Sequence, residues 1–311
     1  MKFPFQIPDA ADFDVVGFGT NAVDHLIQVA EYPEFNSKVE FTQYTREPGG
    51  EVASTLVGLQ RLGLQTAYAG RFGDDREGEF GLQSLTAEGV DTSYAECIEG
   101  ASTQIAFIVI DQKTGERTII WHRDEKLRYD ADAAPVEAAK RCKVLHMTPH
   151  DTEACIRMAA AARGTGALVS IDIDRVFDGL DRLLPLVNIL IASSEFPEAL
   201  TGSPDHKVAL TKIAERYGCK VVGATLGSAG SIFLCEGMFI ETAGFEVPGG
   251  CVDTTGAGDA FRTGFLYGML SGDTISESAR LANAVAALKC RRPGARAGLP
   301  DKTQFALLTK N

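Results

Sequence analysis

Apolar runs of strand length alternate with segments of helical periodicity along most of the chain. Runs rich in Val, Ile and Ala predict strands at 14–19, 66–73, 143–147, 167–173, 188–192 and 220–227. Apolar positions at helical spacing predict helices at 49–63, 77–90, 151–163, 207–217, 257–270 and 275–289. Strands that alternate with helices form a parallel sheet covered on both faces. The pattern therefore predicts an α/β fold with a mostly parallel central sheet.

Two early segments interrupt this alternation. The strand-like runs TQIAFIVI and RTIIWH flank the turn DQKTGE, an arrangement that predicts a β-hairpin. We expect the segments 24–46 and 100–123 to form a small β lid on a single domain that spans residues 1–311. No linker rich in Pro, Gly or Ser divides the chain.

The amino-acid composition limits the kinds of molecule that the protein is expected to bind. The 311 residues carry a formal net charge of −12, and such an acidic surface disfavours nucleic acids and anionic membranes. Seven cysteines without CxxC pairs indicate reduced thiols. The N-terminus lacks a signal-peptide pattern, and no apolar run is long enough to span a membrane. We therefore expect a cytoplasmic protein without a membrane or nucleic-acid partner.

The segment DTTGAGDAFRTGF at 253–265 combines an anion-binding pattern with an acid. Gly256, Ala257 and Gly258 precede an apolar helical run, and the free amides of a helix N-terminus bind anions. Asp259 would repel such an anion, unless it takes a proton from a hydroxyl that attacks a phosphorus atom. The alternative is an ordinary junction in which Asp259 caps the helix. This segment alone leaves both interpretations open.

A second glycine pattern favours a different class of protein. Gly17, Gly19 and Ala22 form a G-x-G-x-x-A motif after the first predicted strand, which is typical of dinucleotide-binding proteins. An NAD-binding oxidoreductase is therefore an alternative, although Pro33 interrupts the helix that this motif requires. A non-catalytic protein that binds a nucleotide or a sugar is the other alternative. P-loop and HExxH motifs are absent from the sequence.

Three segments in order resemble the ribokinase family of carbohydrate kinases, also called the PfkB family. They are Gly49-Gly50 with the following GLQRLGLQTAYAGRFGDDREGEFG, then DTTGAGDAFRTGF, then AALKCRRPGARAGLPD near the C-terminus. The resemblance implies a Rossmann-like three-layer α/β sandwich with a β lid. It implies transfer of the γ-phosphoryl group of ATP to a sugar hydroxyl, with Asp259 as the base and the amides of Gly256, Ala257 and Gly258 as the anion hole. It also suggests a homodimer formed through the lid.

The resemblance assigns roles to further residues. Sugar contacts would come from Asp24, Asn21, Gly49, Gly50, Ser54 and Arg123. The nucleotide would contact Ser193, Thr225, Gly227, Gly230 and Asn283. Mg²⁺ would be held through water by Glu195, in an altered form of the family's N-x-x-E motif with Ala192 or Ser193 at the Asn position. Asp253 and Thr255, with carbonyls near Arg292, Gly294 and Gly298, match a monovalent-cation site, which leaves a K⁺ requirement open.

The chain departs from the family pattern in ways that bear on its substrate. Ser54 stands where many members carry a sugar-binding Asn, and a hydroxyl does not reproduce the donor and acceptor of an amide. This feature and the C-terminal tail resemble members that act on ketoses and on modified or phosphorylated sugars, including sulfofructose kinases. An anionic acceptor would require a cation from among Arg46, Arg71, His122, Arg123 and Arg175. A neutral sugar is the alternative.

Overall fold

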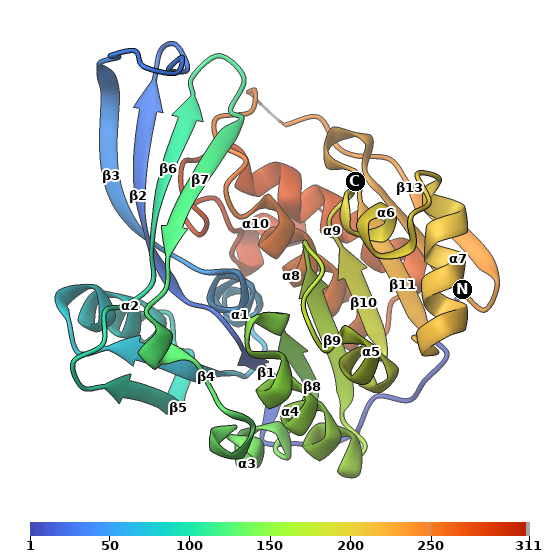
Figure 1. The fold of residues 1–311 in the computed structure, drawn as a ribbon. Coiled ribbons are helices and arrows are strands. Elements are labelled where there is room, and N and C mark those ends of the chain that lie inside the picture. The colour runs from blue at the N-terminus through green and yellow to red at the C-terminus, as the bar shows by residue number, and fades with distance from the viewer. Residues whose placement is uncertain (248, 309–311) are drawn as a thin grey trace.

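The computed structural model describes residues 1–247 and 249–308, which form a large central sheet and a smaller lid sheet. The nine strands of the central sheet follow the order β13-β12-β11-β10-β9-β8-β1-β4-β5. Those from β5 to β11 run parallel, whereas β12 and β13 are antiparallel (Figure 1). The strands are β1 Phe13–Phe18, β4 Thr66–Gly73, β5 Asp91–Ile98, β8 Cys142–Met147, β9 Leu168–Ile173, β10 Ile189–Ala192, β11 Val221–Thr225, β12 Ser231–Cys235 and β13 Met238–Thr242.

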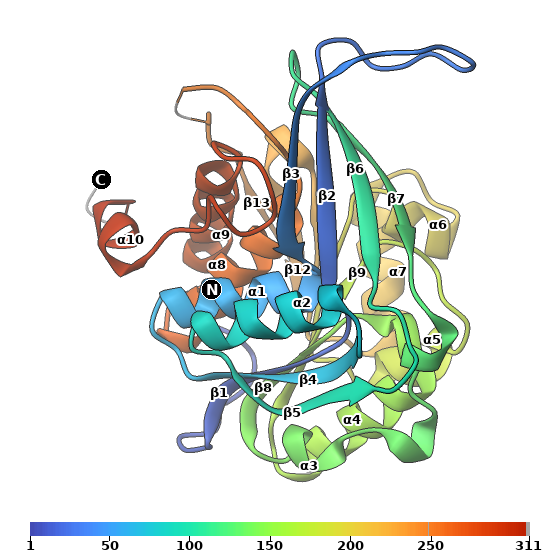
Figure 2. The ribbon, with the colours of Figure 1, turned by 90° about the vertical axis from the view of Figure 1, so that its left-hand side faces the viewer.

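Helices cover both faces of the central sheet, so the predicted three-layer α/β fold is confirmed. Figure 2 shows one helical layer on each side of the strands. The first layer contains α1 Glu51–Arg61, α2 Arg76–Ala87, α8 Ala257–Leu270 and α9 Ile275–Lys289, with α10 Lys302–Leu308 beside it. The second contains α3 Val136–Ala139, α4 Thr152–Gly164, α5 Leu180–Leu183, α6 Phe196–Thr201 and α7 His206–Tyr217.

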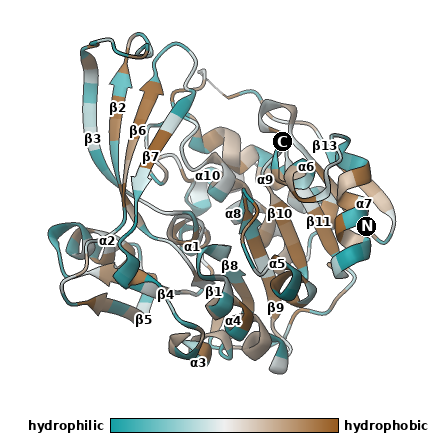
Figure 3. Cartoon of the chain, in the orientation of Figure 1, coloured by the Kyte–Doolittle hydropathy of each residue, from teal (hydrophilic) through white to brown (hydrophobic). Residues whose placement is uncertain are grey.

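The core consists of two apolar layers, one on each face of the central sheet. Every residue of β9 and β10 is buried, because helices cover both faces of these strands. Figure 3 shows the resulting hydrophobic strands. On the α8 face, the rings of Phe233 and Phe265 stack with their centroids 4.7 Å apart. This packing holds α8 against the sheet, which positions its N-terminus.

The lid is a four-stranded sheet with the order β3-β2-β6-β7. Its strands are β2 Ala22–Val29, β3 Phe41–Gly49, β6 Ile105–Asp111 and β7 Arg117–His122. Strands β6 and β7 pair antiparallel, which confirms the predicted hairpin, and β2 runs parallel to β6. The lid stands above one edge of the α/β layers (Figure 1). Its strands lie within residues 22–49 and 105–122, close to the lid segments expected at 24–46 and 100–123.

Two local features differ from the sequence pattern. Gly19 is followed by strand β2 instead of a helix, so the glycine motif lacks the helix N-terminus that a dinucleotide-binding site requires. Strand β5 lies in a stretch for which no strand was predicted. Its residues are mostly half-buried because it lies at the edge of the sheet, which weakens the apolar signal.

The sequence composition led to two expectations about the described part of the chain, one on membrane-spanning segments and one on the state of the cysteines. None of the helices in this part of the chain has the length and hydrophobicity needed to cross a bilayer. All seven cysteines are free thiols, and Cys142, Cys155, Cys219, Cys235 and Cys290 are buried.

Candidate active site

Two adjoining cavities lie at the carboxyl ends of the central strands, where ligands bind in open α/β sheets. The first, the lid cavity, has a volume of about 430 Å³ and lies between the lid and the N-terminus of α8. The second, the helix cavity, has a volume of about 590 Å³ and is bounded by α8, α9 and the loop after β11. Both are lined by Arg117, Ser193, Thr225 and Gly258.

The loop before α8 forms the boundary between the two cavities. Gly256 is the N-cap of the helix, with a φ of 73° that favours glycine. A Cβ at this position would lie 2.7 Å from the Cα of Ala295, so the close approach of the two loops also requires glycine. The Ala257 amide donates to the carbonyl of Thr254 at 3.1 Å. Gly258, which lines both cavities, is therefore the best placed of the three predicted amides to bind an anion.

Asp259 lines the lid cavity from the first turn of α8 and is 9% exposed. The helix begins at Ala257, and its N-cap is Gly256, which has no side chain to cap it. The interpretation of Asp259 as the capping residue is therefore wrong. Burial raises the pKa of Asp259 well above its ordinary value, and the charges of Asp172 and Glu51 add to this shift. Arg262 and Arg117 oppose the rise in this pKa.

Acidic side chains dominate the charge around the lid cavity. Burial raises the pKa values of Asp24, Glu51 and Asp172 to about 7 each. Arg262 forms an ion pair with Asp172 at 2.6 Å, and the hydroxyl of Thr20 donates to Glu51 at 2.9 Å. The lining acids are Asp24, Glu51, Asp172, Asp174 and Asp259, whereas the lining arginines are Arg117, Arg175 and Arg262.

The structure places some of the predicted sugar contacts at the lid cavity. Asp24 and Gly50 line it. Gly49 lies directly behind Asp24, because a Cβ on this glycine would be 2.0 Å from the carboxylate Oδ2. Asn21 lies deeper, where its amide donates to the Tyr68 hydroxyl at 2.5 Å and to the Arg71 carbonyl at 2.9 Å. Asn21 therefore supports the cavity wall without lining it.

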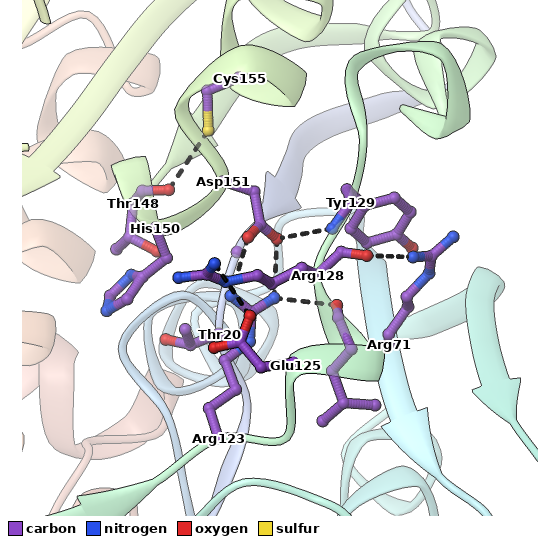
Figure 4. Close-up of polar contacts among 12 residues, drawn as sticks. Thr20, Arg71, Arg123, Glu125, Arg128, Tyr129, Thr148, His150, Asp151 and Cys155 are labelled. Carbon is purple, nitrogen blue, oxygen red and sulfur yellow. Dashed lines mark hydrogen bonds and ion pairs between the residues drawn. The ribbon is translucent and has the colours of Figure 1, made fainter. Parts of the chain in front are cut away.

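Ser54 and Arg123 lie outside both cavities, contrary to the roles predicted for them. Ser54 has no exposed surface and accepts a hydrogen bond from Arg296 at 3.3 Å. Arg123 forms an ion pair with Asp151 at 2.7 Å (Figure 4). It also donates to the Leu127 carbonyl. These internal partners satisfy both side chains, so neither is available to a ligand in the structure.

The structure gathers the predicted nucleotide contacts around the helix cavity. Its lining includes Ser193, Glu195, Thr225, Gly227, Gly230 and Asn283. Hydrogen bonding from the Ser194 side chain lowers the pKa of Glu195, which keeps this carboxylate charged. Ala192 is completely buried in β10, so Ser193 is the residue at the altered N-x-x-E motif that faces the cavity.

Arg117 on β7 is the main functional candidate that the sequence pattern missed. Its Nη1 donates to the Thr254 hydroxyl at 2.7 Å. Thr254 lies in the loop at 253–258, which is predicted to bind an anion and is called the anion-binding loop below. Its Nε is buried and has no hydrogen-bond partner within the part of the chain that the structure describes. Arg117 thus brings a positive charge from the lid to the boundary of the cavities. Its place at the start of a lid strand, beside the hairpin turn, was the available signal.

The cations proposed for an anionic acceptor mostly have other partners. Arg46 pairs with Glu77, and Arg71 pairs with Glu96. His122 does not line the lid cavity, whereas Arg175 does. The Arg175 guanidinium lies over the ring of Trp121, 5.3 Å from its centroid. Arg175 is therefore the one member of that set placed at the cavity.

Comparison with known proteins assigns the family. A family model described as pfkB family carbohydrate kinase matches residues 15–302. The chain belongs to the pfkB family of carbohydrate kinases. An "uncharacterized sugar kinase" of Archaeoglobus fulgidus is 34% identical over 257 residues, which cover 78% of this chain and 98% of that protein. A nucleoside kinase of Methanothermobacter thermautotrophicus is 27% identical over 295 residues, with 93% of each chain covered.

The solved structures agree with the pfkB assignment. A protein of Agrobacterium tumefaciens assigned as a ribokinase superposes with a TM-score of 0.88 at 26% identity, covering 96% of this chain and 97% of the other. Arabidopsis thaliana ribokinase, solved with ribose and ATP, gives a TM-score of 0.80 at 24% identity. The fold is therefore ribokinase-like. Carbohydrate kinases are phosphotransferases with an alcohol acceptor, so the predicted enzyme class is confirmed.

The raised pKa of Asp259 predicts a pH-dependent gain in stability when the acid is removed. A folded state with a raised carboxyl pKa binds the proton more tightly than the unfolded chain, so its stability falls as pH rises above the ordinary pKa. Asp259→Asn should therefore raise the melting temperature of the ligand-free protein by about 2–8 °C at pH 8, and by less at pH 5. Differential scanning fluorimetry at both pH values measures this. The exposed Asp9→Asn serves as the control, and an equal or negative shift at pH 8 would contradict the argument.

Proposed function

We propose that this carbohydrate kinase transfers the γ-phosphoryl group of ATP to a hydroxyl of a sugar or sugar derivative. The observation that carries the proposal is the shared boundary of the two cavities at Gly258, with Asp259 on the lid side. ATP would occupy the helix cavity and the acceptor the lid cavity. The reacting groups would then meet beside the amide of Gly258.

Each residue at this boundary has a distinct role in the proposed reaction. Asp259 takes the proton of the attacking hydroxyl, a task favoured by a carboxyl pKa raised by burial. The Gly258 amide and the positive end of the α8 dipole stabilise the charge on the transferred group. Arg117 adds a full positive charge from the lid side. Phosphoryl transfer depends mainly on such positioning and charge stabilisation.

Mg²⁺ fits the residues of the helix cavity. The described residues contain no cluster of three or more His, Cys, Asp or Glu able to hold a metal. Mg²⁺ in nucleotide enzymes keeps several waters and binds through one or two carboxylates and the phosphates. Glu195, with its lowered pKa, supplies such a carboxylate. When bound, the ion would neutralise charge on the phosphates.

We further propose that the acceptor is a neutral polyhydroxyl compound. Five acids and three arginines line the lid cavity, and the arginines are engaged by Asp172, Thr254 and the Trp121 ring. An anionic acceptor would face more acids than arginines, and of these arginines Arg262 already pairs with Asp172. Carboxylates such as Asp24 accept hydrogen bonds from hydroxyls, and Trp121 offers an apolar surface to the C–H face of a sugar.

A transfer assay tests both proposals. The protein is mixed with ATP, Mg²⁺ and matched pairs of acceptors, each a neutral sugar or nucleoside beside its phosphorylated form, and ADP release is measured. We expect release with a neutral member, and Asp259→Asn should lower kcat by about 10²–10⁴-fold while an ATP analogue still binds in calorimetry. Asp9→Asn serves as the control.

Three outcomes would contradict these proposals. Release of ADP with a phosphorylated acceptor alone would overturn the neutral class and leave the kinase intact. Binding of ATP without turnover of any acceptor would favour the non-catalytic alternative. Binding of NADH, followed by nicotinamide fluorescence, in the absence of ATP binding would favour the oxidoreductase.

The position of Arg117 predicts a loss of turnover when its charge is removed. Arg117→Gln keeps hydrogen-bonding capacity but removes the positive charge at the boundary, and we expect kcat to fall by roughly 10²–10³-fold. The KM for the acceptor should change far less, because the charge acts on the transferred group. The exposed Arg128→Gln is the matched control. A rise in KM at constant kcat would assign Arg117 to acceptor binding instead.

We also propose that two copies pair through the outer face of the lid. Tyr44, Phe107 and Ile120 are 50%, 43% and 63% exposed on the lid strands, and His25 stacks on Tyr44 and Phe107. A second copy would cover this apolar surface together with the lid edges. Sedimentation velocity should give the mass of a dimer. Phe107→Glu should shift it to a monomer, whereas Val208→Glu on α7 should not, and a monomeric wild type would exclude the pairing.

A further inference from the structure

The carboxylate of Asp253 joins the anion-binding loop to the loop that follows α9. Asp253 has no exposed surface. One carboxylate oxygen accepts from the Thr255 amide at 2.8 Å, and the other accepts from the Gly294 amide at 2.7 Å. The two loops approach so closely that Gly256 has no room for a side chain beside Ala295. The position of the Gly258 amide therefore depends on this buried acid.

A buried lysine lies against the same loop. Lys289 is the last residue of α9, and its side chain is completely buried. Its Nζ donates to the main-chain carbonyl of Asp253 at 2.8 Å. An ammonium group in such a place is unfavourable unless negative charge surrounds it. That charge comes from the Asp253 carboxylate and from the negative end of the α9 dipole.

The Asp253 groups expected to hold a monovalent cation already have other partners. The two oxygens of the Asp253 carboxylate face amide hydrogens, which carry partial positive charge. The Asp253 carbonyl faces the Lys289 ammonium. The backbone at Gly298 packs onto the carbonyl of Lys289, since a Cβ there would lie 2.2 Å from its oxygen. The Thr255 hydroxyl is buried and has no hydrogen-bond partner among the described residues. The Asp253 oxygens, which are central to the predicted K⁺ site, therefore do not fit a free cation.

We propose that the Lys289 ammonium is a built-in cation that holds the anion-binding loop in place of an added monovalent cation. The protein should then work equally well without K⁺. Lys289 acts as a positioning residue, because it reaches the reacting groups through Asp253 and the loop to Gly258. The activity part of its test rests on the kinase function proposed above.

The wild-type protein supplies the first test. ADP release and melting temperature are measured in potassium, sodium and tetramethylammonium chloride at equal ionic strength. We expect rates equal within about two-fold and equal melting temperatures, because a cation that binds the folded state would raise stability. A several-fold higher rate or a higher melting temperature in K⁺ would overturn the proposal. The melting temperatures remain informative even if no acceptor is turned over.

Removal of the lysine supplies the second test. Lys289→Ala leaves a space beside Asp253, and we expect kcat to fall by at least about ten-fold with little change in the KM for ATP. Ammonium or K⁺ should restore part of the rate and of the melting temperature, whereas tetramethylammonium should restore neither. Lys207→Ala, at an exposed ion pair with Glu241, is the control. If the variant kept the wild-type rate without added cation, the proposed role of Lys289 would be contradicted. If the variant did not fold, the salt series on the wild-type protein would decide the question.

Discussion

The close contact between the loops at Gly256 and Ala295 determines where α8 begins, and the site depends on that position. A side chain at Gly256 would push the loops apart, because its φ of 73° and the short distance leave room for glycine alone. The helix then places the Gly258 amide and the Asp259 carboxylate within its first turn. Under the proposed function, anion binding and proton removal would thus occur one residue apart.

This arrangement concentrates acidic side chains at the lid cavity, where the proposed function places the acceptor. Asp24, Glu51, Asp172 and Asp259 all have raised pKa values, with burial as the main cause. Such acids destabilise the empty cavity at neutral pH, since each holds its proton more tightly in the folded state. Acceptor hydroxyls can donate hydrogen bonds to these carboxylates and reduce that destabilisation. Under the proposed function, the cavity would therefore be more stable with a polyhydroxyl acceptor bound.

The fold and the glycine-rich loop of the candidate site could be predicted from the sequence, whereas the position of Arg117 and the burial of Ser54 could not. The alternation of strands and helices, the hairpin of β6 and β7 and the glycine-rich loop carry local signals, and each was confirmed in the structure. Arg117 could not be found in this way, because it meets Thr254 across 137 positions of the chain. Ser54 was misplaced for the converse reason. Ser54 does follow the glycine pair as predicted. Neighbouring residues in the sequence could not indicate that Arg296, 242 positions away, would bury it.

Under the proposed function, the lid would both cover the acceptor and form part of the phosphoryl-binding boundary. Two residues of its hairpin tip contact the anion-binding loop. The Gly115 carbonyl accepts from the Thr254 amide at 3.2 Å and from its hydroxyl at 3.1 Å, and Arg117 donates to that hydroxyl. A lid lifted from this position would take the arginine away from the boundary and admit water to the cavity. Closure would therefore bring the positive charge into place at the same time as it excludes water. Under the proposed function, hydrolysis of ATP without an acceptor would be limited by the same contact that promotes transfer.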